Sequence, residues 1–139
     1  MAAMAPNNDI NLSELGQPGR FPRSARLLRH ADFERVYKQG RRHFAAHMTV
    51  FYLSRPVGAG FRVGFTVGRV LGGAVDRNRM KRRLREAVRF RYPESGAAMD
   101  VVINPKKSLL HAEFPDLLNE VGQAFRVIQR ASFQSAVGR

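Results

Sequence analysis

Residues 72–91 read GGAVDRNRMKRRLREAVRFR. On a helix of about 3.6 residues per turn, its apolar residues fall on one side, at the spacing of a buried stripe. These residues are Met80, Leu84, Ala87 and Val88. The opposite side carries a polar and basic row of Asn78, Arg82, Arg85 and Arg89, flanked by Arg79 and Lys81. The stretch therefore predicts a helix with one side for core packing and one side for a polyanion.

A charged helix side is most often a solvated one, in which acidic and basic residues pair at i, i+3 or i+4 spacing. Within residues 77–91 only Glu86 is acidic, so such pairing is nearly absent. Like charges such as Lys81 and Arg85 oppose helix formation by roughly 0.2–0.5 kcal/mol per pair. A bound anion would offset this repulsion, which favours a binding surface over a merely solvated one.

The whole chain is strongly basic. It has 139 residues, which suits one domain, with 24 Lys and Arg against 11 Asp and Glu and a formal net charge of +13. This excess predicts a polyanionic partner, either nucleic acid or an anionic membrane. No apolar run approaches the roughly 20 residues of a membrane-spanning helix, and Trp is absent, so we expect nucleic acid and no membrane.

The sequence carries no recognisable catalytic or metal-binding motif. It has no cysteine, which excludes disulfides and thiolate metal sites. His43 and His47 come nearest to metal-ligand spacing but lack the glutamate of an HExxH motif. No serine lies in GxSxG, and the carboxylates are scattered. We therefore expect no catalytic residue and no metal ligand, and the lack of a secretory signal makes the cytoplasm the expected location.

The N-terminal part divides into three segments. Residues 1–19 are small and polar and are expected to be a disordered extension. Arginines at every third position from Arg20 to Arg29, including Arg26, predict an extended basic arm. Residues 31–39 predict a short helix in which Phe33 and Tyr37 lie one turn apart. Two rings in that arrangement are either core residues, which composition alone favours, or a platform for unpaired bases.

The remaining segments predict a small sheet and a final helix. Residues 47–53 and 61–67 have strand composition and are joined by a short Gly/Pro loop, so we expect them to pair antiparallel. Alternation places Thr49 and Phe51 on one face of the first strand. Residues 43–44 predict a short preceding strand, and residues 99–103 a later one. An apolar period from Phe114 to Ala131 predicts the last helix.

The order of elements predicts a layered α/β domain over residues 20–131, followed by a tail at residues 132–139. We expect the helices on one face of the sheet and the other face open, as antiparallel strands allow.

The chain resembles a known family, the protein component of bacterial ribonuclease P. Residues 71–85, LGGAVDRNRMKRRLR, are similar to the family's Arg-Asn-Arg signature. The DF–VY helix, the VGFTV strand, the glycine turn and DVVI-NP follow in the family's order, and the resemblance covers about residues 21–130. The chain departs from the family pattern at Val70, Gly73 and Phe51, where Lys, Asn and Tyr are common.

The resemblance implies both a fold and a function. The fold is α+β, a two-layer α/β sandwich with three helices, a small mixed sheet of about four strands and a left-handed βαβ crossover. The general right-handed rule would not have predicted that crossover. The function is that of the protein subunit of ribonuclease P, an endoribonuclease whose RNA subunit removes the 5′ leader of precursor tRNA. Mg²⁺ is the implied cofactor, bound mainly by the RNA, with one protein per RNA in the bacterial cytoplasm.

The resemblance also implies site residues. The RNA-binding helix would use Arg77, Asn78, Arg79, Lys81, Arg82 and Arg85, and Arg89 continues the same row. The leader cleft, between the sheet and the first helix, would be lined by Phe33, Tyr37, Thr49 and Phe51. This makes a platform the preferred interpretation of the two aromatic residues of the first helix. Arg26 and Arg69 are expected to be additional basic contacts.

Two alternatives stay open. The first is a structural RNA-binding protein of the ribosomal type, with no role in a nuclease. The second is a DNA-binding regulator that places the basic helix in a major groove. The second is disfavoured, because a strand and a glycine turn precede the basic helix where a helix-turn-helix protein would have another helix.

Overall fold

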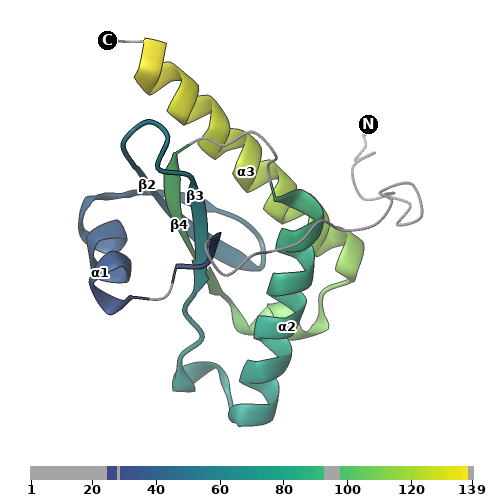
Figure 1. The fold of residues 1–139 in the computed structure, drawn as a ribbon. Helices are drawn as coiled ribbons and strands as arrows, with labels where there is room; N and C mark the ends of the chain where they lie inside the picture. The colour runs from purple at the N-terminus through teal and green to yellow at the C-terminus, as the bar shows by residue number, and fades with distance from the viewer. Residues whose placement is uncertain (1–24, 28, 93–97, 138–139) are drawn as a thin grey trace.

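The computed structural model describes residues 25–27, 29–92 and 98–137 and places three α-helices against a four-stranded sheet (Figure 1). The expected extension at residues 1–19 lies outside this part. The α-helices are α1 (His30–Gln39), α2 (Ala74–Arg91) and α3 (Phe114–Val137). The strands are β1 (Arg41–Phe44), β2 (Met48–Ser54), β3 (Phe61–Phe65) and β4 (Met99–Pro105). Two 3₁₀ turns, η4 (Arg69–Leu71) and η5 (Lys107–His111), precede α2 and α3.

The strands lie in the order β1-β2-β4-β3. β2 runs antiparallel to both β1 and β4, whereas β3 runs parallel to β4. The expected antiparallel pairing of residues 47–53 with residues 61–67 is therefore wrong, because β4 lies between them. A short loop permits a hairpin without requiring one, and β4 is buried along almost its whole length, as a central strand is. The α+β class, the three helices and the four-stranded mixed sheet are confirmed.

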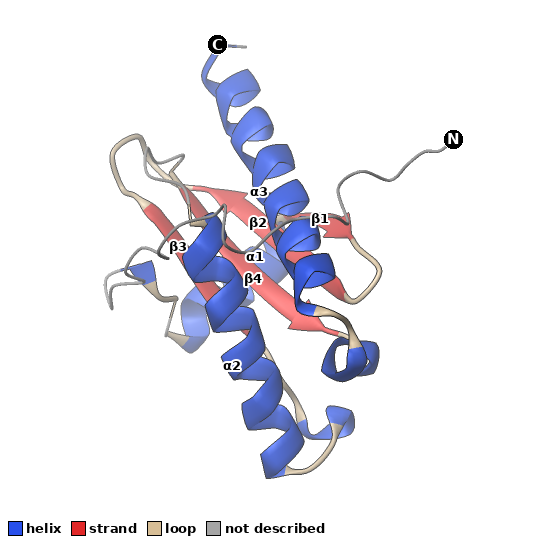
Figure 2. Ribbon diagram, turned by 90° about the vertical axis from the view of Figure 1, so that its right-hand side faces the viewer, coloured by secondary structure: helices blue, strands red, loops and turns tan. Residues whose placement is uncertain are grey.

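The helices cover both faces of the sheet. Figure 2 shows α2 and α3 in front of the sheet, over the face that carries Met48, Val50 and Tyr52, and these elements share the main hydrophobic core. α1 packs on the opposite face, where Leu27, Val36 and Val102 form a smaller cluster. The expectation that all helices lie on one face is therefore wrong. Phe51 and Leu53 give the second face enough apolar surface to hold one short helix.

α2 packs as its period predicts. Met80, Leu84, Ala87 and Val88 are buried, and burying a side chain such as Leu84 contributes about 1.5–3 kcal/mol. Gly72 precedes the helix with φ of 140°, a conformation that favours glycine. At the other end, the hydroxyl of Tyr92 donates a 2.5 Å hydrogen bond to the carbonyl of Phe61 on β3. α3 continues beyond residue 131, where the apolar period ends.

Candidate nucleic-acid interface

The outward side of α2 is exposed and basic. Asn78, Arg79, Arg82 and Arg85 are exposed, whereas Arg77, Lys81 and Arg89 are half-buried. Arg89 is paired with Glu86 within the helix, at 3.1 Å. Among the described residues, no carboxylate lies within ion-pair distance of Arg79, Arg82 or Arg85. We call these three residues the basic row, and their charge is available to an external anion.

Two other arginines of α2 serve the fold. Arg83 Nη1 donates to the carbonyls of Leu109 and Leu110, at 3.0 and 2.8 Å, and Arg83 Nη2 donates to the carbonyl of Ala112. These bonds satisfy the carbonyl groups at the end of η5. Arg91 Nε donates to the carbonyl of Leu118 on α3, at 3.2 Å. Burial is the main cause that lowers the pKa of both guanidinium groups.

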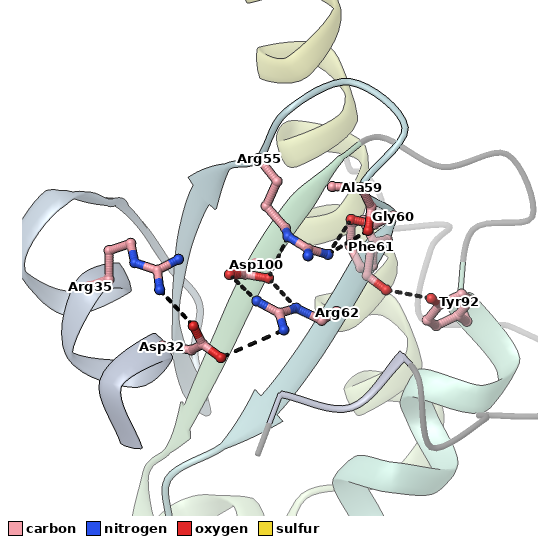
Figure 3. Close-up of polar contacts among 9 residues, drawn as sticks. All are labelled: Asp32, Arg35, Arg55, Ala59, Gly60, Phe61, Arg62, Tyr92 and Asp100. Atoms are coloured by element: carbon pink, nitrogen blue, oxygen red, sulfur yellow. Dashed lines mark hydrogen bonds and ion pairs between the residues drawn. The ribbon is translucent and has the colours of Figure 1, made fainter. Parts of the chain in front are cut away.

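A network of arginines around two buried carboxylates ties α1 to the sheet (Figure 3). Arg62 Nε and Nη2 each donate a 2.8 Å hydrogen bond to Asp100, whose side chain is 1% exposed. Arg55 Nε lies 3.4 Å from the same carboxylate. Arg62 Nη1 also lies 3.6 Å from Asp32 on α1, and Arg35 donates to Asp32 at 2.7 Å. The hydrogen bond to Asp100 is the main cause that raises the pKa of Arg62.

The face of the sheet under α1 brings the four expected cleft residues together. The rings of Tyr37 and Phe51 meet edge to face, with centroids 4.9 Å apart. The Tyr37 hydroxyl forms hydrogen bonds with Thr66 Oγ1 at 2.6 Å and with Asn104 Oδ1 at 2.9 Å. Thr49 is the register partner of Asn104. The rings are therefore packed against one another and still half-exposed, so core packing and a binding surface coexist here.

Thr66 and Asn104 are the residues of this surface that the sequence analysis missed. The only available signal was the Asn104-Pro105 pair that follows residues 99–103. That pair is typical of the end of a strand and does not predict a hydrogen bond between Asn104 and Tyr37.

Phe33 lies against Gly64 of β3. A Cβ on Gly64 would lie 2.6 Å from Phe33 Cζ, so the ring occupies the space that a side chain would fill. A pocket of about 250 Å³ opens beside this contact, at the outer edge of β3. Its lining includes Arg26, Phe33, Phe65, Lys81 and Arg85.

Arg26 reaches this edge because residues 26 and 27 pair with β3. Arg26 forms a parallel bridge with Val63, and the amide of Leu27 donates to the Val63 carbonyl at 2.9 Å. The pocket therefore joins the aromatic surface under α1 to the basic side of α2, around one edge of the sheet. Arg69 lies apart from this lining, exposed in η4.

The described residues do not fit a resident Mg²⁺. No three His, Cys, Asp or Glu side chains in the described ranges lie close enough together to hold a metal ion. Asp32 and Asp100, the buried carboxylates, are engaged by arginines. The His47 ring contacts Ser108 Oγ at 2.8 Å and lies 3.7 Å from Glu120. In the same ranges, no helix has both the length and the apolar character that crossing a membrane requires.

Comparison with known proteins gives a consistent result. The profile of the family described as Ribonuclease P matches residues 21–129. A protein named "Ribonuclease P protein component" from Symbiobacterium thermophilum is 41% identical over 100 residues, which cover 72% of this chain and 87% of that protein. A protein of the same name from Acidothermus cellulolyticus is 40% identical over 105 residues, covering 72% of this chain and 84% of that protein.

Solved structures agree with the sequence matches. The RNase P protein of Staphylococcus aureus superposes with a TM-score of 0.65 at 25% identity, covering 75% of this chain and 94% of that one. The RNase P protein of Thermotoga maritima gives a TM-score of 0.59 at 27% identity, covering 70% of this chain and 96% of that one. With the signature stretch on an exposed basic helix and a profile match over most of its length, the chain belongs to the ribonuclease P protein family.

Proposed function

We propose that this chain is the protein component of a bacterial ribonuclease P, working in the cytoplasm with one protein per catalytic RNA. It binds that RNA and the 5′ leader of precursor tRNA, and so assists the cleavage that matures the 5′ end of tRNA.

The observation that carries this proposal is the pocket at the edge of β3. It places Phe33 of α1 beside Lys81 and Arg85 of α2, so an aromatic surface and a cationic one are continuous. A site for single-stranded nucleic acid combines both kinds of surface, because unpaired bases stack on aromatic rings and phosphates pair with cations.

The protein's contribution is binding and positioning. Arg77, Arg79, Arg82 and Arg85 neutralise phosphates and release counterions, and each phosphate contact on a single strand contributes about 0.7 to the salt slope of binding. Phe33, Tyr37 and Phe51 hold unpaired bases by stacking, which tolerates any sequence. Mg²⁺, held mainly by the RNA subunit, supplies the chemistry of bond cleavage.

Reconstitution tests this function. The chain is combined with a bacterial ribonuclease P RNA, and cleavage of precursor tRNA is measured at low Mg²⁺, where cleavage should depend on the protein. The double variant Arg82→Ala/Arg85→Ala should bind precursor tRNA more weakly and with a flatter salt dependence, while its thermal unfolding stays unchanged. If the chain does not stimulate cleavage by the RNA, the proposed function is wrong, and the alternative of a structural RNA-binding protein is favoured.

A further inference from the structure

Strand β1 brings two residues to the α1 side of the sheet that the proposed leader cleft does not include. In the β1–β2 ladder Arg42 is opposite Phe51, and Phe44 is opposite Thr49. Residues directly opposite each other in an antiparallel pair point to the same face. Arg42 and Phe44 therefore lie on the face that carries Thr49 and Phe51, whereas Arg41, one residue earlier, points to the other face.

Arg42 is already placed on an aromatic ring. Its guanidinium carbon lies 5.5 Å from the centroid of the Phe51 ring, at the distance of a cation–π contact. Tyr37 meets the same ring edge to face. Phe51 is thus contacted by a ring from α1 and by a cation from β1. The Arg42 side chain is exposed, so its guanidinium places hydrogen-bond donors for a phosphate beside the cleft.

Phe44 is an aromatic side chain exposed to solvent. It is 68% exposed, and among the exposed large apolar side chains of the described residues it alone is aromatic. A single exposed apolar residue needs no explanation by itself. Phe44, however, neighbours Thr49 on the cleft face and lies two residues from Arg42, so a ring and a cation recur together next to an existing pair of the same kind.

We propose that Arg42 and Phe44 extend the leader cleft by one strand and bind one further unpaired nucleotide of the same RNA strand. The base stacks on Phe44, and the adjoining phosphate is held by Arg42. This inference rests on the proposed function, because it needs a single strand that already lies across Phe33, Tyr37 and Phe51. It adds a length requirement, since a strand must extend past Thr49 before β1 contributes.

The experiment measures the affinity of the protein for oligouridylates that lengthen one nucleotide at a time. Wild-type affinity should rise until the strand reaches β1. Phe44→Ala and Arg42→Ala should lose only the last increment, about tenfold for one stacked base. Phe44→Trp should keep that increment. Arg41→Ala removes the same charge from the other face of β1, and Val57→Ala trims another exposed apolar residue, so both should follow the wild type at every length.

The outcomes separate this inference from the proposed function. If the wild type binds no single-stranded RNA of any length, the leader cleft itself is wrong. If short strands bind but Phe44→Ala matches the wild type at all lengths, or Arg41→Ala loses as much as Arg42→Ala, only the extension to β1 is wrong. Thermal unfolding of Phe44→Ala should match the wild type, because the ring is not part of either core.

A second arm identifies which RNA supplies the nucleotide. The reconstituted enzyme is given precursor tRNAs with leaders of increasing length, and the effect of Phe44→Ala should appear only with the longer leaders. An equal loss at every leader length, or a loss of affinity for the RNA subunit alone, would assign Phe44 to the subunit interface and overturn the proposal.

Discussion

Arg62 of β3 and Asp100 of β4 are register partners in the parallel ladder and share two hydrogen bonds of 2.8 Å each. The pair lies under the start of α1, where Asp32 is 3.6 Å from the same guanidinium. The helix that carries Phe33 and Tyr37 is thus held at one end by charges and along its length by a small apolar cluster.

Replacing Asp100 with Asn should destabilise the protein severely. The change keeps the shape of the side chain but leaves Arg55 without its buried counter-charge and Arg62 with the more distant Asp32 alone. Breaking a buried pair of this kind costs about 3–5 kcal/mol. Urea unfolding measures the loss. Lys38→Ala is the control, because its pair with Glu34 is exposed and should contribute less than about 1 kcal/mol. Equal effects of the two variants would contradict the importance of the network.

Arg82 and Arg83 are adjacent and should have separable effects. Arg83→Ala loses its bonds to the carbonyls of η5 and should lower the free energy of unfolding by roughly 2–3 kcal/mol, with an unchanged salt slope of RNA binding. Arg82→Ala should leave unfolding unchanged and reduce that salt slope by about 0.7. Salt titrations and urea unfolding of both variants measure the difference. A reduced slope in the Arg83 variant would show that its side chain also reaches RNA.

Gly64→Ala should disturb the cleft through Phe33. The new methyl group would lie 2.6 Å from Phe33 Cζ and 2.9 Å from Leu27 Cβ, so the ring or the arm must move. Overpacking of this kind costs roughly 1–3 kcal/mol, and the displaced ring should weaken single-strand binding. Gly68→Ala is the matched control, because nothing lies within 4 Å of the added Cβ. Wild-type oligonucleotide affinity in Gly64→Ala would argue against Phe33 as a stacking residue.

Tyr92 should make stability fall at alkaline pH. Burial raises its pKa above the ordinary value of 10.0, so above that pH the unfolded chain loses a proton that the folded chain keeps. The contribution is therefore complete below pH 10.0 and is lost as the pH rises through the folded-state pKa. Tyr92→Phe should be less stable at neutral pH by about 0.5–1.5 kcal/mol, because it lacks the bond to Phe61.

The measurement for Tyr92 is the free energy of unfolding between about pH 8 and pH 12, a window on both sides of the ordinary tyrosine pKa. The difference between wild type and Tyr92→Phe should shrink as the pH rises. A constant difference across the window would mean that the hydroxyl titrates alike in both states.

Periodicity predicted the packing of this protein better than its pairing. The stripe of α2 and the two faces of β2 were correct, because they depend on residues close in sequence. The position of β4 between β2 and β3 was missed, because strand order depends on contacts between residues 38 to 57 positions apart, which no local pattern encodes.

The charges show the same limit. The helical period separates Arg82 from Arg83, but only the place of η5 in the fold makes Arg83 a partner of carbonyl groups. Arg62 gave no signal, because Asp100 lies far along the chain in a segment recognised only as apolar. Phe33, Tyr37, Thr49 and Phe51 could be grouped only through the family resemblance, since they come from two separate elements.

The strand order also governs how the protein can be made. Its central strand β4 is the last to leave the ribosome, after β1, β2, β3 and the whole of α2. Until then β2 and β3 have no common partner, and among the four strands only β1 and β2 can pair. Each waiting strand exposes an unpaired edge, the kind of surface through which nascent chains associate. The growing polypeptide therefore carries a fully synthesised arginine-rich segment before the sheet on which that segment packs can be completed.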